Sequence, residues 1–167
     1  VNTDTVATAV GGPTNGPEVR VALDLPGGRK LNVVENSFNF QLAKYLEDKN
    51  REPERVFTFD NLTFDTDKAT ITAEARPNVV DLINIMEAYP TLKIRIEGHT
   101  DNTGDMAVNR PLSAARAQAV RQALLDAGVA ADRVTTEEYG PTKPVASNDT
   151  PEGRQKNRRI DVRVLSL

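Results

Sequence analysis

Residues 92 to 128 carry two different hydrophobic periods within one short piece of chain. In LKIRIE, apolar residues at positions 92, 94 and 96 alternate with charged residues, the last of which is Glu97. This period of two predicts a strand whose apolar face is buried and whose charged face, Glu97 included, is exposed. In SAARAQAVRQALLDAG the apolar residues follow the spacing of a helix instead, so the segment in between is predicted to be a strand-to-helix loop.

The predicted helix has a candidate residue at each end. Ser113 is the candidate N-cap, and Gly128 stands where the helix should stop. Arg116 would then lie in the first helical turn, where free N–H groups and the helix dipole favour a bound carboxylate. The inward face of this helix carries Ala117, Val120 and Leu124.

Strand and helix patterns also alternate through the rest of the chain from residue 56. VFTFDNLTF favours a strand, and RPNVVDLINIMEAY has the apolar spacing of a helix with Pro77 near its first turn. DRVTTEEYG and RIDVRVL are predicted to be two further strands. Residues 56–167 are therefore predicted to form an α+β domain, a two-layer α/β sandwich with helices packed on one mixed sheet.

Two segments precede this domain. Residues 1–17 mix Gly, Pro, Thr and Asn without a sustained apolar period, and they are predicted to be a flexible linker. Residues 18–55 are predicted to form a small extension, in which a β-hairpin turns at PGG and a helix capped by Asn36 or Ser37 follows. A length of 167 residues suits one ordinary domain plus such an extension.

Composition excludes several classes of function. The balance of 21 basic against 24 acidic residues, with a pI near 5.3, lacks the basic excess that nucleic-acid binding needs. The absence of cysteine rules out disulfides, thiolate zinc sites and a cysteine nucleophile. No apolar run approaches the roughly 20 residues of a membrane span. Any membrane anchor is therefore expected to lie in a part of the protein before Val1.

The loop EGHTDNTG and the helix after it carry charges of opposite sign. From spacing alone, Asp101 and Arg116 suit either a structural ion pair or a site for a charged ligand. His99, the only histidine, is predicted to be packed and hydrogen-bonded rather than a metal ligand, because carboxylates would have to supply every other ligand. We expect no metal and no cofactor. Of the arginines in KNRR, Arg158 and Arg159 are predicted to be solvated or in internal salt bridges, and only Arg159 is expected to reach the site.

Four motifs, in unbroken order from about Phe57 to about Val164, resemble those of a known family. FDTDKATI, EGHTDNTG, NRPLSAARA and EYGPTKPVASNDTPEGRQKNRRIDVRV are similar to the OmpA-like C-terminal domain, shared by outer-membrane porins, peptidoglycan-associated lipoproteins and flagellar stator proteins. The resemblance implies a βαβαβ-type domain that lies in the periplasm, tethered to the outer membrane. It implies noncovalent binding of peptidoglycan through the meso-diaminopimelate residue of the stem peptide. Further expected partners are envelope proteins or a second copy of the chain.

The resemblance also implies roles for two charged residues. Asp101 and Arg116 match the aspartate and arginine that bind diaminopimelate in the family. Diaminopimelate presents an ammonium and a carboxylate on one carbon. Asp101 would accept the ammonium, and the guanidinium fork of Arg116 would hold the carboxylate as a lysine could not.

Three further residues match the family's binding site, and Thr100 is an additional candidate beside them. Asn109 would hydrogen-bond the ligand or only shape the loop, with the first role favoured. Thr100 would offer its hydroxyl to the ligand or satisfy the loop backbone. Phe64 and Asp65 match the segment that lines the other wall of the pocket, often through backbone groups.

Two other functions stay open from the sequence. A peptidoglycan hydrolase of the glycosidase type needs a paired acid and carboxylate, and the 24 acidic residues allow such a pair without marking one out. A serine hydrolase would need His99, but no Gly-x-Ser-x-Gly elbow is present. The other alternative is a stator or scaffold component of an envelope machine, in which dimerisation matters more than the ligand.

Overall fold

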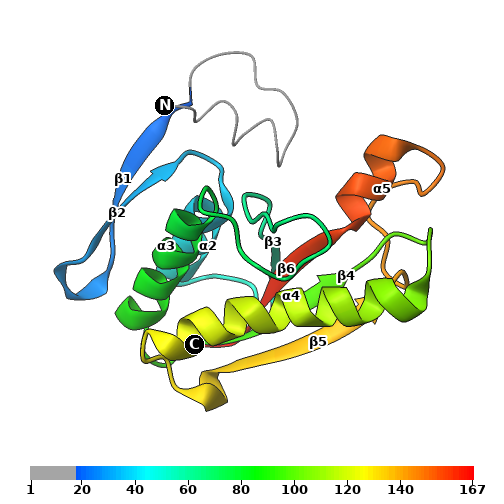
Figure 1. The fold of residues 1–167 in the computed structure, drawn as a ribbon. Helices are drawn as coiled ribbons and strands as arrows, with labels where there is room; N and C mark the ends of the chain where they lie inside the picture. Colours follow the sequence, from blue (N-terminus) through cyan, green and yellow to red (C-terminus); the bar gives the residue numbers. More distant parts are fainter. Residues whose placement is uncertain (1–17) are drawn as a thin grey trace.

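The computed structural model describes residues 18–167, and a mixed four-stranded sheet organises them (Figure 1). The strands are β3 (Val56–Thr58), β4 (Lys93–His99), β5 (Val134–Gly140) and β6 (Arg159–Ser166), in the order β3-β6-β4-β5. β6 pairs antiparallel with β3 and β4, whereas β4 and β5 are parallel. The predicted α+β fold with a mixed sheet is confirmed. The predicted linker, residues 1–17, lies outside the described residues.

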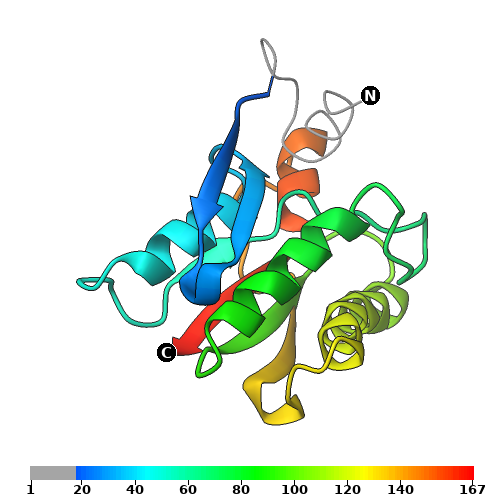
Figure 2. The same cartoon turned by 90° about the vertical axis from the view of Figure 1, so that its left-hand side faces the viewer.

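Three helices lie side by side across one face of the sheet (Figure 2). They are α2 (Phe38–Glu47), α3 (Arg76–Ala88) and α4 (Met106–Asp126). Pro77 lies at the start of α3, as predicted, because its missing N–H costs nothing in the first turn. None of the helices in residues 18–167 is long and apolar enough to cross a membrane.

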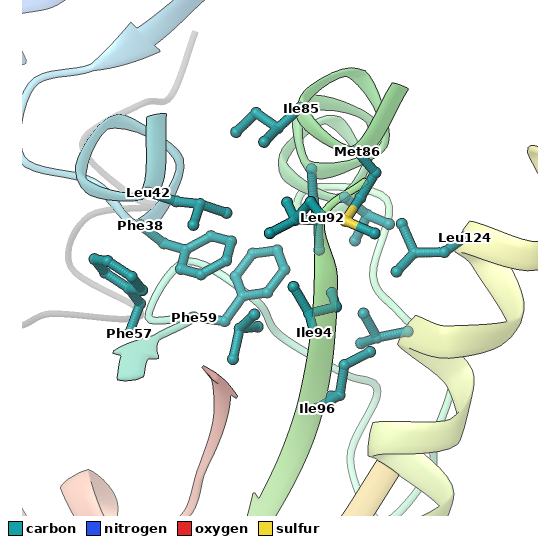
Figure 3. Packing of buried hydrophobic residues seen from close by; sticks show 14 of the residues in the cluster. Phe38, Leu42, Phe57, Phe59, Ile85, Met86, Leu92, Ile94, Ile96 and Leu124 are labelled. Carbon is teal, nitrogen blue, oxygen red and sulfur yellow. The ribbon is translucent and has the colours of Figure 1, made fainter. Parts of the chain in front are cut away.

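One hydrophobic core fills the space between these helices and the sheet (Figure 3). On one side, Phe38 of α2 stacks on Phe59, which follows β3, with ring centroids 4.2 Å apart. On the other, Met86 of α3 and Leu124 of α4 belong to the same buried cluster as Ile94 of β4. Burial of each such side chain stabilises the fold by about 1.5–3 kcal/mol, so this core holds the helices in place on the sheet.

The extension before β3 contributes to this core. β1 (Arg20–Asp24) and β2 (Lys30–Val34) pair antiparallel around the short 3-10 turn η1 (Pro26–Gly28), as the predicted hairpin requires. Ser37 caps α2, since its hydroxyl accepts a hydrogen bond from the Phe40 backbone N–H at 3.4 Å. From the turn, Arg29 reaches Glu87 on α3 at 3.0 Å. The hairpin therefore lies against the helical layer (Figure 1).

The start of α4 differs from the prediction. The helix begins at Met106, and its N-cap is Asp105, whose side chain accepts a hydrogen bond from the Ala107 backbone N–H at 2.9 Å. Ser113 is therefore an interior helical residue and not a cap. The other end agrees with the prediction: α4 stops at Asp126, and Gly128 has a φ of 100°.

Three smaller differences concern the sheet and its connections. β3 is shorter than the predicted strand, and β4 continues beyond residue 97 to His99. Glu97 is buried, with 1% of its surface exposed, although the alternation of LKIRIE predicted an exposed residue. A short helix before β6, α5 (Pro151–Asn157), was not expected from the hydrophobic pattern.

Candidate functional site

A cleft of about 1020 Å³ lies at the end of the sheet where β3 and β4 finish and β6 begins. Its lining residues come from four segments, namely residues 58–64, 99–104, 109–116 and 145–160. The first segment starts at the end of β3, and the second starts at the end of β4 and continues into the loop before α4. The third segment belongs to α4, and the last contains α5 (Figure 1). This volume is at the upper end of the range of small-molecule pockets.

Asp101 is the buried anion of this cleft, with 4% of its surface exposed. Its Oδ1 accepts hydrogen bonds from the backbone N–H and the hydroxyl of Thr103, both at 2.7 Å. Its Oδ2 accepts one from Nη1 of Arg158 at 2.5 Å. Burial raises the pKa of Asp101, but the bonds from Thr103 and Arg158 more than offset this effect. The pKa is therefore below its usual value, and the side chain is charged at neutral pH.

Arg116 enters the same cleft from α4, and its guanidinium is held in a fixed plane. Its Nε donates to the carbonyl of Lys68 at 2.8 Å, and its Nη2 donates to the carbonyl of Asp65 at 3.4 Å. The guanidinium carbon lies 5.0 Å from the centre of the Phe64 ring. None of the ion pairs within residues 18–167 includes Arg116. No carboxylate of this part of the chain therefore lies within ion-pair distance of Arg116, and Asp67 acts on its charge only from farther away.

The structure excludes one alternative for this pair and corrects one expectation about Arg116. Asp101 and Arg116 do not form an ion pair with each other, because Asp101 contacts Arg158 while Arg116 contacts backbone carbonyls. Arg116 is also not in the first turn of its helix, since α4 begins at Met106. The free N–H groups and the dipole of the helix N-terminus act only within about the first turn, so they do not assist Arg116.

Thr100 and Asn109 line the cleft, and both contribute to the shape of the loop. The hydroxyl of Thr100 donates to the Asp101 carbonyl at 2.8 Å, which favours the backbone role for this residue. Nδ2 of Asn109 donates to the Thr103 carbonyl at 3.0 Å. No hydrogen bond within residues 18–167 engages Oδ1 of Asn109, so this oxygen is available to a ligand donor.

Phe64 and Asp65 have different positions relative to the cleft. Phe64 lines it and supports Arg116 through its ring. Asp65 has an exposed side chain and is not part of the lining. Its carbonyl nevertheless accepts the hydrogen bond from Arg116, and its N–H donates to the Thr70 carbonyl at 2.9 Å. Asp65 thus acts on the site through its backbone.

The fourth wall of the cleft depends on Asn157, the last residue of α5. Asn157 is completely buried. Its Oδ1 accepts hydrogen bonds from the backbone N–H groups of Val145 at 2.7 Å and Ala146 at 3.0 Å. Its Nδ2 donates to the Ala146 carbonyl and to Oδ1 of Asn148, both at 2.9 Å. These four bonds fasten the loop before α5 to the residue that precedes Arg158.

Arg158 is the site residue that the sequence reasoning missed. Its side chain is 52% exposed and contacts Asp101, whereas Arg159 forms an internal salt bridge with Asp161 at 3.1 Å. The expectation that only Arg159 reaches the site is therefore wrong. Successive side chains of an extended segment point to opposite sides, so Arg158 and Arg159 at the start of β6 were bound to differ in direction. That alternation was the available signal.

A buried ionic network lies next to the cleft on β4 and β6. Glu97, His99 and Asp161 are close enough for three of their ligand atoms to lie within 4.8 Å of one another. The two carboxylates, however, already bind guanidinium groups. Oε2 of Glu97 accepts from Arg95 at 3.0 Å and Arg163 at 2.8 Å, and Asp161 accepts from Arg159. A divalent cation would face three guanidinium charges there, so the chemistry of this cluster fits an internal salt-bridge network better than a metal site.

His99 is buried as predicted, but it is not hydrogen-bonded as predicted. Its ring stacks on Tyr139 with centroids 5.4 Å apart. Neither ring nitrogen has a hydrogen-bond partner in residues 18–167. Burial, together with the nearby charge of Arg159, lowers the pKa of His99, against the opposing effect of Asp161. The imidazole is therefore neutral at neutral pH.

Comparison with known proteins gives the cleft a family context. The model of the OmpA family matches residues 63–158, which include the β4–α4 loop, α4 and α5. The chain belongs to the OmpA family. The match runs from residue 63 to Arg158, so it includes the second and third lining segments of the cleft, most of the fourth, and only the last two residues of the first.

Relatives of this OmpA-family chain include outer-membrane and cell-wall proteins. Outer membrane protein Omp38 of Acinetobacter baumannii is 42% identical over 121 residues, which cover 72% of this chain and 32% of Omp38. Peptidoglycan-binding protein ArfA of Mycobacterium tuberculosis is 48% identical over 77 residues, which cover 46% of this chain and 24% of ArfA. The cell wall anchor of the type VI secretion system (T6SS) of Pseudomonas aeruginosa has a similar structure, with a TM-score of 0.58, 29% identity, and coverage of 67% of this chain and 80% of that chain. The chain thus spans less than half the length of the two curated relatives.

Proposed function

We propose that this domain binds peptidoglycan noncovalently, through the diaminopimelate residue of the stem peptide, and anchors an envelope complex to the cell wall. The observation that carries the proposal is a single cleft that contains a buried anion, Asp101, and a guanidinium without a carboxylate partner in the described chain, Arg116. A free amino-acid head has an ammonium, which needs an anion such as Asp101, and a carboxylate, which needs a cation such as Arg116. On this proposal the domain works in the periplasm and is tethered toward the outer membrane.

The two groups suit the two ends of a zwitterion in different ways. Oδ2 of Asp101 lies in a buried environment, where a charge-assisted hydrogen bond to an ammonium is stronger than in water. Arg116 is oriented by its Nε and Nη2 bonds and by the Phe64 ring, so its remaining N–H groups are preorganised for a carboxylate. A lysine at position 116 would offer neither this plane nor the paired donors.

The relatives support the proposal at a coarser level. One of them is named as a peptidoglycan-binding protein and another as a cell wall anchor, and each resembles part of this chain. A hydrolase would need a site for water activation or a nucleophile in the same cleft. Asp101 is instead held by Thr103 and Arg158, and Arg116 is held by backbone carbonyls, so binding without cleavage is the better-supported function.

Removal of either charge tests the proposal. Asp101→Asn keeps the shape of the side chain and removes the anion, and Arg116→Ala removes the fork. Each should weaken binding to soluble diaminopimelate stem peptide by about 1.5–3 kcal/mol, the contribution of a hydrogen bond to a charged group. Arg110→Ala is the matched control, because Arg110 lies on the same helix, pairs with Glu138 and is not part of the cleft lining.

Co-sedimentation with purified sacculi provides the second readout. The wild-type domain and Arg110→Ala should sediment with the polymer, and the two cleft variants should stay in the supernatant at matched protein concentration. Circular dichroism should show that all four proteins are folded. Unchanged retention of both cleft variants would remove these residues from the binding site, and release of soluble fragments by the wild-type protein would favour a hydrolase.

A further inference from the structure

The carboxylate of Asp101 is already occupied in the cleft by a group of the protein itself. Both bonds from Thr103 go to Oδ1, and Arg158 binds Oδ2 at 2.5 Å. A carboxylate has about four acceptor positions, two on each oxygen. Only one position, on Oδ2, is left for an incoming ammonium, and Arg158 lies beside it.

A ligand ammonium and Arg158 would not share this oxygen comfortably. Both groups carry a full positive charge, and two like charges about 4 Å apart repel each other appreciably even near a protein surface. Arg158 also has freedom to leave, since half of its side chain is exposed and its only ion pair within residues 18–167 is the one with Asp101. Asp101 would keep its position without Arg158, because Thr103 holds it with two bonds.

We propose that Arg158 is a built-in competitor for the ligand ammonium, which closes the anionic end of the cleft and must swing away from Asp101 for ligand to bind. This inference rests on the proposed function of the cleft. It assigns Arg158 a role as an affinity-setting residue that contacts the anion and not the ligand carboxylate. The ion pair satisfies the buried charge of Asp101 in the empty cleft, at a cost in affinity when the ligand enters.

Arg158→Gln is the direct test, and Lys156→Gln is its matched control. Lys156 lies two residues away on α5, also lines the cleft, and forms no ion pair within residues 18–167. Both variants remove one positive charge from the same wall, but only Arg158→Gln removes the competitor. Isothermal titration with two soluble stem peptides, which carry meso-diaminopimelate or lysine at the same position, measures the consequence.

We expect Arg158→Gln to bind the meso-diaminopimelate peptide roughly threefold to fivefold more tightly than wild type, which is the upper part of the range for an exposed ion pair, because Asp101 is buried. The gain should be similar for lysine, because both probes bring an ammonium to Asp101. Lys156→Gln should leave both affinities within about twofold of wild type. Weaker binding of meso-diaminopimelate to Arg158→Gln, with lysine unaffected, would mean that Arg158 holds the ligand carboxylate, and it would overturn the inference.

A ligand-free readout checks the ion pair itself. Carbon-13 NMR titration of the Asp101 carboxyl should give a higher pKa in Arg158→Gln than in wild type, because one of the bonds that lower it is lost. An unchanged pKa would show that the pair does not form in solution. Asp101→Asn separates the two proposals: if it leaves binding intact, the proposed function fails, whereas if it abolishes binding and Arg158→Gln gives no gain, only the competitor role fails.

Discussion

At the scale of single residues, the environment of His99 makes the stability of the fold depend on pH. Burial and Arg159 lower its pKa, while Asp161, Glu97 and Glu138 act in the opposite direction with smaller effect. A folded-state pKa below the unfolded value of about 6.5 means that the unfolded chain binds the proton more tightly. The contribution of His99 to stability is therefore full above about pH 7 and is lost as the pH falls below 6.5.

NMR can observe this titration directly, because the chain has only one histidine. The imidazole protons should titrate with a pKa below 6.5. The free energy of unfolding of wild type should also fall relative to that of His99→Gln between pH 7.5 and pH 5.5. The comparison with His99→Gln is necessary because Asp81, whose pKa burial raises to about 6, changes stability in the opposite sense over this range. A His99 pKa at or above 6.5 would contradict the described environment.

The same scale shows what a sequence can and cannot reveal about individual side chains. Asp101 and Arg116 were identified because their types and their motif suggested a charged ligand, and both do lie in the cleft. Glu97 was misjudged because its burial depends on Arg163, a partner 66 residues away on the neighbouring strand. Alternation could have separated Arg158 from Arg159, but it could not predict the contact of Arg158 with Asp101, which spans 57 residues. Alternation along a strand predicts which side of the sheet a side chain lies on, but it does not predict which buried charged residues form salt bridges.

At the scale of elements, the α5 wall of the cleft depends on one buried amide. Asn157→Ala would remove four hydrogen bonds and leave the backbone N–H groups of Val145 and Ala146 without their acceptor. Leaving a buried donor unsatisfied costs about 1–3 kcal/mol, so unfolding should become easier by at least that amount in urea titrations. Amide exchange should also be faster at residues 145 and 146.

Asn148→Ala serves as a milder substitution with which the stability loss of Asn157→Ala can be compared. Asn148 gives Asn157 only one acceptor through its side chain, so the loss of stability should be less than half as large. Equal effects of the two substitutions, or no effect of either, would contradict the role of Asn157 as the fastening of this loop.

The elements themselves followed from the sequence more closely than their boundaries did. Strong periods in residues 76–88 and 92–97 predicted α3 and β4, because burial of one face dominates those segments. The start of α4 was placed too late because its first turns, MAVNRPL, carry little apolar periodicity and include Pro111. The Asp105 cap overrides that weak local pattern. α5 was missed because Asn157 fixes it through bonds to residues 145–148, and its own seven residues contain no apolar stripe.

At the scale of the whole molecule, the core and the cleft occupy different places: the core lies between the helices and the sheet, and the cleft lies at one end of the sheet. α2, α3 and α4 share a core with the sheet, and the cleft lies beyond the end of β4, where backbone connections leave the sheet. A single amino-acid head offers few contacts, so affinity for one stem peptide should be modest. Retention on sacculi would then come from rebinding among densely repeated stems, which raises the apparent affinity without new contacts.

The central claim is that the cleft reads the ammonium and the carboxylate of one amino-acid head together. Isothermal titration of the wild-type domain with two soluble stem peptides, one containing meso-diaminopimelate and one containing lysine at the same position, tests it most directly. The lysine peptide keeps the ammonium for Asp101 but has no carboxylate on that carbon for Arg116. The lysine peptide should bind the wild-type domain more weakly by about 1.5–3 kcal/mol, and this difference between the two peptides should disappear in Arg116→Ala. Equal affinity of the wild-type domain for the two peptides would contradict the claim.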